Sequence, residues 1–322
     1  MSAENLTLEG CTVVTIGEIL VEFVSHQTGC GLAKIGTFSG PYPSGAPAIF
    51  VDQAARMGAD AHMIGGVGED GFGRVVLDRL RDDGVETNGV SVVPGYSTGT
   101  AFVSYDADGG RDFIFHLTGT AADRFDPDTA LPAGHVALHV SAASLGSAPM
   151  RAAILRAVDV VQAAGGAITC DPNARPQLMR DDAARDALDR IMAVSDCLMP
   201  STSDFAHLYP GASAQDATDR LLSTGARIVA LKRGAEGATI FAGGTRYDLP
   251  GHAVEERDPT GAGDCFCGTF VAALTGGASA LEAGRLANAA GAIAVTRRGP
   301  MEGNSTPEEI DRFLAGHRGN AA

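Results

Sequence analysis

Residues 257–270 read RDPTGAGDCFCGTF, and this stretch predicts a helix that begins at an anion site. The run after Asp264 places Phe266 and Phe270 on one helical face, and the glycine pair 276–277 would end the helix. Unpaired backbone N–H groups and the positive end of the helix dipole lie at such a start. Because the residues before Asp264 are small, a phosphate can approach those N–H groups closely. The stretch therefore predicts a phosphate-binding helix N-terminus with a carboxylate beside it.

Asp264 has two interpretations at this position. Phosphoryl transfer depends mainly on positioning and charge stabilisation, and it needs one group that accepts the proton of the attacking hydroxyl. A carboxylate beside the phosphate site suits that role, and the helix dipole keeps it ionised. The alternative is an ordinary acidic residue in a first helical turn, where acids are common for dipole reasons alone. The spacing by itself leaves both interpretations open.

The overall charge of the chain narrows the classes of partner. The 322 residues carry a formal net charge of −15, which argues against nucleic acid and anionic membranes as partners. The start of the chain has no basic flank before an apolar run, and no stretch has the uncharged length of a membrane span. We therefore expect a cytoplasmic protein. Cys265 and Cys267 form a pair with no second Cys or His pair at zinc spacing, so we expect free thiols.

Strand-like apolar runs alternate with helical patterns along most of the chain. This alternation predicts an α/β fold, a doubly wound and mostly parallel sheet with helices on both faces, in a single domain over residues 1–322. Ligands of such sheets bind beyond the carboxyl ends of the strands. Polar residues follow the expected strands at those ends, namely Glu22, Asp171, Asn173, Ser201, Asp204, Lys232 and Arg233.

Residues 97–117 break this alternation, because two strand-like runs flank a turn-forming sequence. We expect a small β-sheet lid over the binding face, formed from about 32–44 and 95–120. Phe113 lies in the second run, where it either caps a sugar or only packs the lid. Exposed sheet edges need to be covered, so a homodimer through the lid is also expected.

The stretch DPTGAGDCFCGTF resembles the C-terminal signature of the PfkB family of carbohydrate kinases, and SGAPAIFVDQAARMG resembles the N-terminal signature. GEILVEF, GGVGEDGFG, DPNARPQL and LKRGAEGA resemble further strands and loops of the family, so the resemblance covers most of the chain. It implies the ribokinase-like fold and transfer of the γ-phosphate of ATP to a sugar, with Mg²⁺ as the metal. It also favours the catalytic interpretation of Asp264.

The resemblance implies a role for individual residues of this chain. Asp264 is the implied catalytic base, and the anion hole is implied to consist of Gly261, Ala262 and Gly263. The residues implied to bind the nucleotide are Thr260, Ser201, Lys232, Gly234, Gly237 and Asn288. Those expected to face the sugar are Glu22, Ser44, Gly45, Phe113 and Asn173. Asp204 is assigned indirectly to Mg²⁺, and Asp258 to a monovalent cation such as K⁺.

Three parts of the sequence depart from the family pattern. Ser44 precedes Gly45 where the family usually has two glycines, and Ile49 stands where it often has Asn. The Asn-x-x-Glu of the family, linked to magnesium and phosphate, is Ser-x-x-Asp here, from Ser201 to Asp204. These departures leave the sugar contacts open, whereas Mg²⁺ held largely by ATP phosphates and water should still bind.

The sequence GVGEDG, from Gly66 to Gly71, matches the G-x-G-x-x-G pattern of dinucleotide sites. It follows an internal strand rather than the first strand of a βαβ unit, and no acid follows on a second strand. A nicotinamide oxidoreductase is therefore the weakest of the functions considered.

The kind of sugar depends on which cations lie near the binding face. An acidic or phosphorylated sugar needs such a cation. Leu117 occupies the position of the fructokinase-like lid arginine, and only Lys34 and Arg111 remain nearby. The stretch GPYPSGAPAIFVDQAARMG resembles tagatose- and fructose-type kinases, so we predict phosphorylation of a neutral ketohexose at a primary hydroxyl. A 2-keto-3-deoxygluconate kinase, a ribokinase, and a sugar or nucleotide sensor without catalysis are the alternatives.

Overall fold

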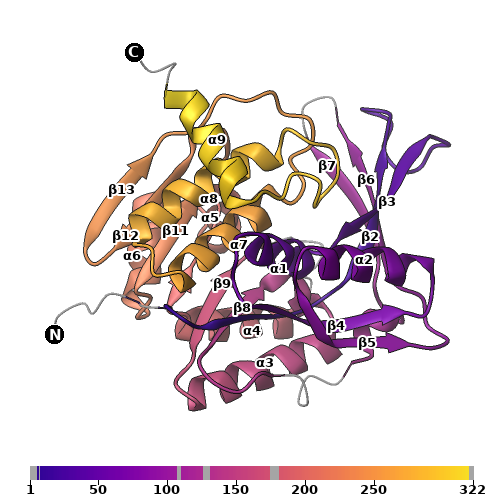
Figure 1. The fold of residues 1–322 in the computed structure, drawn as a ribbon, viewed down its shortest axis with the longest axis horizontal. Helices are drawn as coiled ribbons and strands as arrows, with labels where there is room; N and C mark the ends of the chain where they lie inside the picture. The colour runs from indigo at the N-terminus through magenta and orange to yellow at the C-terminus, as the bar shows by residue number, and fades with distance from the viewer. Residues whose placement is uncertain (1–5, 7, 107–109, 126–130, 175–180, 319–322) are drawn as a thin grey trace.

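The computed structural model describes residues 6, 8–106, 110–125, 131–174 and 181–318. The strands of its large sheet are β1 (Thr12–Ile16), β4 (Ala61–Gly68), β5 (Glu86–Val93), β8 (Val136–Ser141), β9 (Ala167–Asp171), β10 (Cys197–Leu198), β11 (Ile228–Lys232), β12 (Ala238–Ala242) and β13 (Thr245–Leu249). They are ordered β13-β12-β11-β10-β9-β8-β1-β4-β5 (Figure 1). Neighbours from β11 to β5 are parallel, and β12 and β13 add an antiparallel edge. The predicted mostly parallel sheet is confirmed.

Helices cover both faces of this sheet (Figure 1). Successive strand residues point to opposite faces, so Val13 packs in one hydrophobic core and Val14 in the other. The first core includes residues of α1 (Ala46–Arg56), α2 (Gly71–Asp82), α7 (Ala262–Thr275) and α8 (Ala280–Ala294). The second includes residues of α3 (Ala148–Ala163), α4 (Asp182–Val194), α5 (Thr202–Leu208) and α6 (Ala214–Ser223). The last helix, α9 (Pro307–Arg318), packs on α8 through Ile310 and Leu314.

A second, four-stranded sheet lies on the side of the molecule opposite β12 and β13 (Figure 1). Its strands are β2 (Leu20–Ser25), β3 (Phe38–Ser44), β6 (Gly99–Tyr105) and β7 (Arg111–His116), in the order β3-β2-β6-β7. The predicted hairpin over residues 97–117 is confirmed as β6 and β7, which pair antiparallel. The separate small sheet agrees with the expected lid strands, and its function as a lid stays a prediction.

The structure corrects the place of Glu22. This residue lies on β2 in the small sheet, rather than at the carboxyl end of a strand in the large sheet. The chain leaves the large sheet at Gly17, where a Cβ would lie only 2.2 Å from Pro47 Cγ, so close packing against α1 needs a glycine there. Two further elements, β5 and α5, were not predicted, because β5 begins with polar residues and α5 has only 7 residues.

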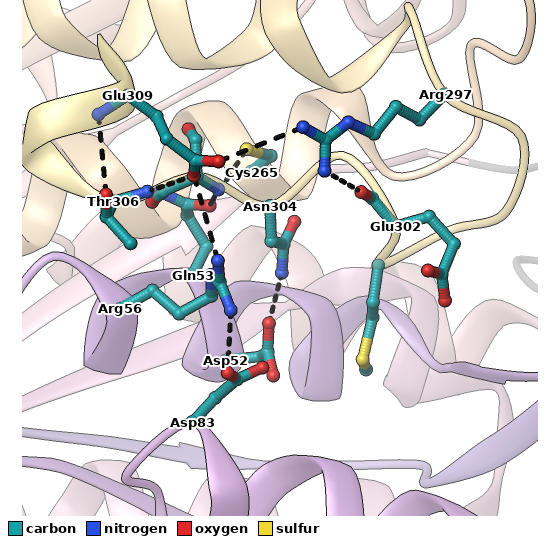
Figure 2. A network of polar contacts seen from close by, with 12 residues as sticks. Asp52, Gln53, Arg56, Asp83, Cys265, Arg297, Glu302, Asn304, Thr306 and Glu309 are labelled. Carbon is teal, nitrogen blue, oxygen red and sulfur yellow. Dashed lines mark hydrogen bonds and ion pairs between the residues drawn. The ribbon is translucent and has the colours of Figure 1, made fainter. Parts of the chain in front are cut away.

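A polar network fixes the segment between α8 and α9 onto α1 and α2 (Figure 2). The Nδ2 atom of Asn304 donates to Asp52 Oδ2 at 2.6 Å, and the backbone N–H of Ser305 donates to Gln53 Oε1 at 2.8 Å. Arg79 of α2 donates to the backbone oxygen of Met301 at 2.9 Å. The network matters for α7, because this segment also contacts the residues that begin that helix.

Asp52 is fully buried in this network, and we expect it to make stability depend on pH. Burial, together with the Asp83 carboxylate and against the opposing charge of Arg79, raises the pKa of Asp52 to about 7. The folded protein therefore keeps a proton that the unfolded chain has released, and stability falls as pH rises from about 4 to about 7. Between about pH 6 and about pH 8 the loss should be about 1 kcal/mol.

Urea denaturation at the two pH values tests this expectation. Asp52→Asn mimics the protonated carboxyl, so the variant should lack this part of the pH dependence. Asp186→Asn, at an exposed position of α4, should keep the wild-type dependence. An Asp52→Asn protein with the full wild-type dependence would show that another group carries the proton.

Candidate active site

The first turn of α7 is built as the sequence predicts. Gly261 is the N-cap residue with φ of 81°, a left-handed conformation that favours glycine. A Cβ at this position would lie 2.3 Å from the backbone oxygen of Pro300, so no side chain fits there. Asp264 lies in the first turn and is buried, with 7% of its surface exposed. The predicted helix start, its small residues and the buried carboxylate are thus all present.

A pocket brings this turn together with the small sheet and α1. Five of the residues assigned from the sequence to the catalytic, nucleotide or sugar site line it, namely Glu22, Ser44, Gly45, Thr260 and Asp264. Ile49, where the sequence departs from the family pattern, also lines it. Gly45 has φ of 111°, and a Cβ on it would lie 2.4 Å from the backbone oxygen of Glu18. Members of all three predicted sets of residues therefore line one pocket.

Phe115 and Glu18 also line the pocket. Glu18 was given no role from the sequence, whereas Phe115 lies with Phe113 on the aromatic face that was expected either to cap a sugar or only to pack the lid. Phe115 is on the same face of β7 as Phe113, and the two rings stack with centroids 5.3 Å apart. Phe113 itself is not among the described residues that line the pocket. The alternation of aromatic residues along β7 was the available signal for Phe115. The signal for Glu18 was its place four residues before Glu22 in GEILVEF.

Two buried carboxylates, those of Glu18 and Glu22, line the pocket. Glu22 Oε2 accepts a hydrogen bond from Ser44 Oγ at 3.3 Å, and Glu18 Oε2 accepts one from Ser144 Oγ at 2.5 Å. Both acids are buried, with 3% and 5% of their surfaces exposed. Among the described residues that line the pocket, none is a lysine or an arginine. The pocket therefore suits a ligand whose hydroxyl groups donate hydrogen bonds. Its carboxylates repel a ligand that is itself negatively charged.

Lys232 places a positive charge beside the first turn of α7. Its Nζ donates to Asp171 Oδ2 at 2.5 Å and lies 3.4 Å from Cys267 Sγ. A Cβ on Gly263 would lie 3.5 Å from the same Nζ. Burial lowers the pKa of Lys232, but the negative charge of Asp171 and the nearby Asp204 outweighs burial, so the pKa is raised and the ammonium stays charged. The predicted anion site at the helix start thus has a buried ammonium group next to it.

Ser201 and Asp204 begin α5 as a capping box. Asp204 accepts hydrogen bonds from the backbone N–H and the hydroxyl of Ser201, both at 2.6 Å, and from the backbone N–H of Ala174 at 2.7 Å. The backbone of Ser201 also pairs with that of Lys232, which places this helix start near the predicted anion site. The assigned roles of Ser201 with nucleotide and Asp204 with Mg²⁺ stay predictions.

The other assigned residues are not among those that line the pocket. Gly234 and Gly237 adopt positive φ in the loop after β11. Asn288 of α8 donates to the backbone oxygen of Pro250 at 2.8 Å. Asn173 follows β9, with φ of 33° and its backbone N–H donating to Asp171 at 3.1 Å. Their nucleotide and sugar contacts stay predictions.

Asp258 lies just before the anion loop and is fully buried. Its carboxylate accepts hydrogen bonds from the backbone N–H groups of Thr260 at 3.0 Å and Gly299 at 2.9 Å, and from the Tyr105 hydroxyl.

Within the described part of the chain, no cluster of three or more His, Cys, Asp or Glu side chains could hold a metal ion. The described helices include none long and apolar enough to cross a membrane.

Comparisons with known proteins place the chain as a whole in a family. The family model for pfkB family carbohydrate kinases matches residues 12–307. The chain is 32% identical over 314 residues to Fructokinase-1 of Oryza sativa subsp. japonica, which covers 94% of this chain and 97% of that protein.

Two solved structures have the same fold. The E. coli protein named Ribokinase II, solved in complex with ATP and Mg²⁺, is 41% identical with a TM-score of 0.88, covering 95% of this chain and 100% of that chain. Fructokinase from Vibrio cholerae O395, in its fructose, ADP and calcium ion bound form, is 25% identical with a TM-score of 0.83, covering 95% and 100%. The protein therefore has the ribokinase-like fold, and it belongs to the pfkB family of carbohydrate kinases, as a sugar kinase.

Proposed function

We propose that this protein transfers the γ-phosphate of ATP to a primary hydroxyl of a neutral ketohexose, of the fructose or tagatose type. The observation that carries the proposal is the pocket, which is lined by Asp264, Glu22 and Glu18. The described residues that line it include no cationic side chain. Carboxylates accept hydrogen bonds from sugar hydroxyls and repel a carboxylate or phosphate on the sugar. A neutral sugar therefore fits better than 2-keto-3-deoxygluconate.

In this mechanism Asp264 accepts the proton of the sugar hydroxyl as that oxygen attacks the γ-phosphorus, and the bond from this phosphorus to the β,γ-bridging oxygen breaks so that ADP leaves. The backbone N–H groups at the start of α7 and the ammonium of Lys232 stabilise the charge on the transferring phosphoryl group. Glu22, Glu18 and the small sheet orient the sugar and reduce the access of water. Mg²⁺ bound to the nucleotide would neutralise part of the phosphate charge. Asp171 and Asp204 lie near Lys232, and from there they would hold water ligands of the Mg²⁺ ion.

The relatives support the same substrates. Rice Fructokinase-1 and the Vibrio fructokinase carry fructose in their names, and the E. coli structure contains ATP and Mg²⁺.

A homodimer through the small sheet is also part of the proposal. It is supported by β7, which is an edge strand with Ile114 53% exposed. A monovalent cation near Asp258 would need backbone carbonyl ligands as well, because its carboxylate already accepts three donors.

ADP release over a panel of acceptors tests the proposed substrate class. The panel contains fructose, tagatose, psicose, ribose, 2-keto-3-deoxygluconate, fructose 6-phosphate and adenosine, each with ATP, Mg²⁺ and K⁺. We expect the largest kcat/KM for fructose or tagatose, at least about tenfold above any acidic or phosphorylated sugar, because the latter would place an uncompensated anion among the carboxylates. Turnover of 2-keto-3-deoxygluconate without turnover of a free ketohexose would overturn the proposal.

A further inference from the structure

Tyr105 connects the small sheet to the loop that forms the anion site. It is the last residue of β6, and its half-buried side chain reaches the segment before α7. The hydroxyl donates to Asp258 Oδ1 and lies 2.8 Å from Thr260 Oγ1. Thr260 lines the pocket and immediately precedes Gly261. One phenol group therefore bridges the proposed lid and the residues that shape the anion hole.

Asp258 extends this connection to a third segment. Its carboxylate accepts the backbone N–H of Gly299 as well as that of Thr260. Gly299 is followed by Pro300. The backbone oxygen of Pro300 packs so closely against Gly261 that a Cβ on Gly261 would lie only 2.3 Å from it. The carboxylate thus holds together the end of β6, the loop before α7 and the loop after α8. A shift of any one of these would move the N-terminus of α7.

The Tyr105 hydroxyl is the donor in its contact with Asp258, and the Asp258 side chain is fully buried. Hydrogen bonds to charged groups are stronger than those between neutral groups, so removing this one should be measurable.

We propose that Tyr105 is a positioning residue that couples the small sheet to the anion hole, by holding Asp258 and Thr260 through its hydroxyl. The consequence for catalysis rests on the proposed sugar-kinase function, whereas the coupling itself does not. Loss of the hydroxyl leaves the small sheet and the α7 loop free to move separately. The transition state, which needs the N–H groups of that loop in place, is affected more than sugar binding.

Tyr105→Phe removes the hydroxyl and keeps the ring. We expect kcat to fall about tenfold while the sugar KM changes less than about threefold, because the lost contact acts on the anion hole. Tyr247→Phe, on β13 at the far edge of the large sheet, is the matched control and should keep wild-type kinetics. In an Asp258→Asn background, Tyr105→Phe should have little further effect, since the acceptor of its hydrogen bond has changed. Full additivity of the two variants would overturn the proposal.

Amide hydrogen exchange tests the coupling without any assumption about the substrate. The N–H groups of Thr260 and Gly299 both donate to Asp258, so in Tyr105→Phe they should exchange at least about tenfold faster than in the wild type. In Tyr247→Phe they should exchange at the wild-type rate. Unchanged exchange in Tyr105→Phe would overturn the coupling. If the wild-type enzyme phosphorylates no sugar of the panel, the proposed function fails, and the exchange result still decides the role of Tyr105.

Discussion

The Asp264→Asn protein is expected to lose about a thousandfold in kcat on its best sugar, because a general base typically contributes about a hundredfold to ten-thousandfold. The substitution keeps the shape of the side chain and leaves the N–H groups of the α7 N-terminus in place. Nucleotide affinity should therefore stay within about threefold of the wild type. Steady-state kinetics together with calorimetric titration of ATP would measure both quantities.

A matched control separates the base from an ordinary first-turn acid. Glu282 occupies the first turn of α8, where the dipole favours an acid in the same way. Glu282→Gln should change stability by less than about 1 kcal/mol and leave kcat unchanged. If Asp264→Asn behaves like Glu282→Gln, with small effects on stability and none on kcat, Asp264 is only a helix-start residue.

Lys232→Met is expected to have the second largest effect, on both activity and stability. The variant removes the charge beside Gly263 and leaves Asp171 buried without its cation, with 3% of the Asp171 side chain exposed. We expect kcat to fall about a hundredfold, as for the loss of one oxyanion-stabilising group. The free energy of unfolding should fall by about 3 kcal/mol, because a buried charge loses its partner. Kinetics and urea denaturation measure the two effects.

A double variant distinguishes these two effects of Lys232. Lys232→Met with Asp171→Leu replaces the ion pair by apolar side chains, so most of the stability should return. Activity should not return, because the positive charge at the anion site is still missing. A stable double variant with wild-type kcat would show that Lys232 has no part in catalysis.

The parts of the fold that depend on local patterns were predictable from the sequence. The strand–helix alternation indicated the large sheet, and the opposite cores of Val13 and Val14 follow from the period of a strand. The start of α7 was predictable because small residues, a first-turn acid and an apolar run are consecutive. Position 261 needs a glycine because the backbone oxygen of Pro300, 39 residues away, leaves no room for a side chain. That contact was not visible in the sequence.

Other features depend on contacts between distant segments. The membership of β2 in the small sheet is fixed by its pairing with β3 and β6, which no local pattern specifies. The same holds for Tyr105, whose partner Asp258 is 153 residues away. The pairing of Lys232 with Asp171 joins the ends of two strands, and the sequence indicated only that both residues lie at that edge. Sequence patterns thus identified most of the elements and five of the residues that line the pocket, whereas the contacts between them required the structure.

The most direct test is the identification of the product formed from fructose, ATP and Mg²⁺ by phosphorus and carbon NMR. The account predicts one ester, with the phosphate on a primary hydroxyl of the ketohexose, formed in step with ADP and abolished in Asp264→Asn. Formation of ADP without a sugar phosphate, or an ester only when the acceptor carries a carboxylate or a phosphate, would contradict it.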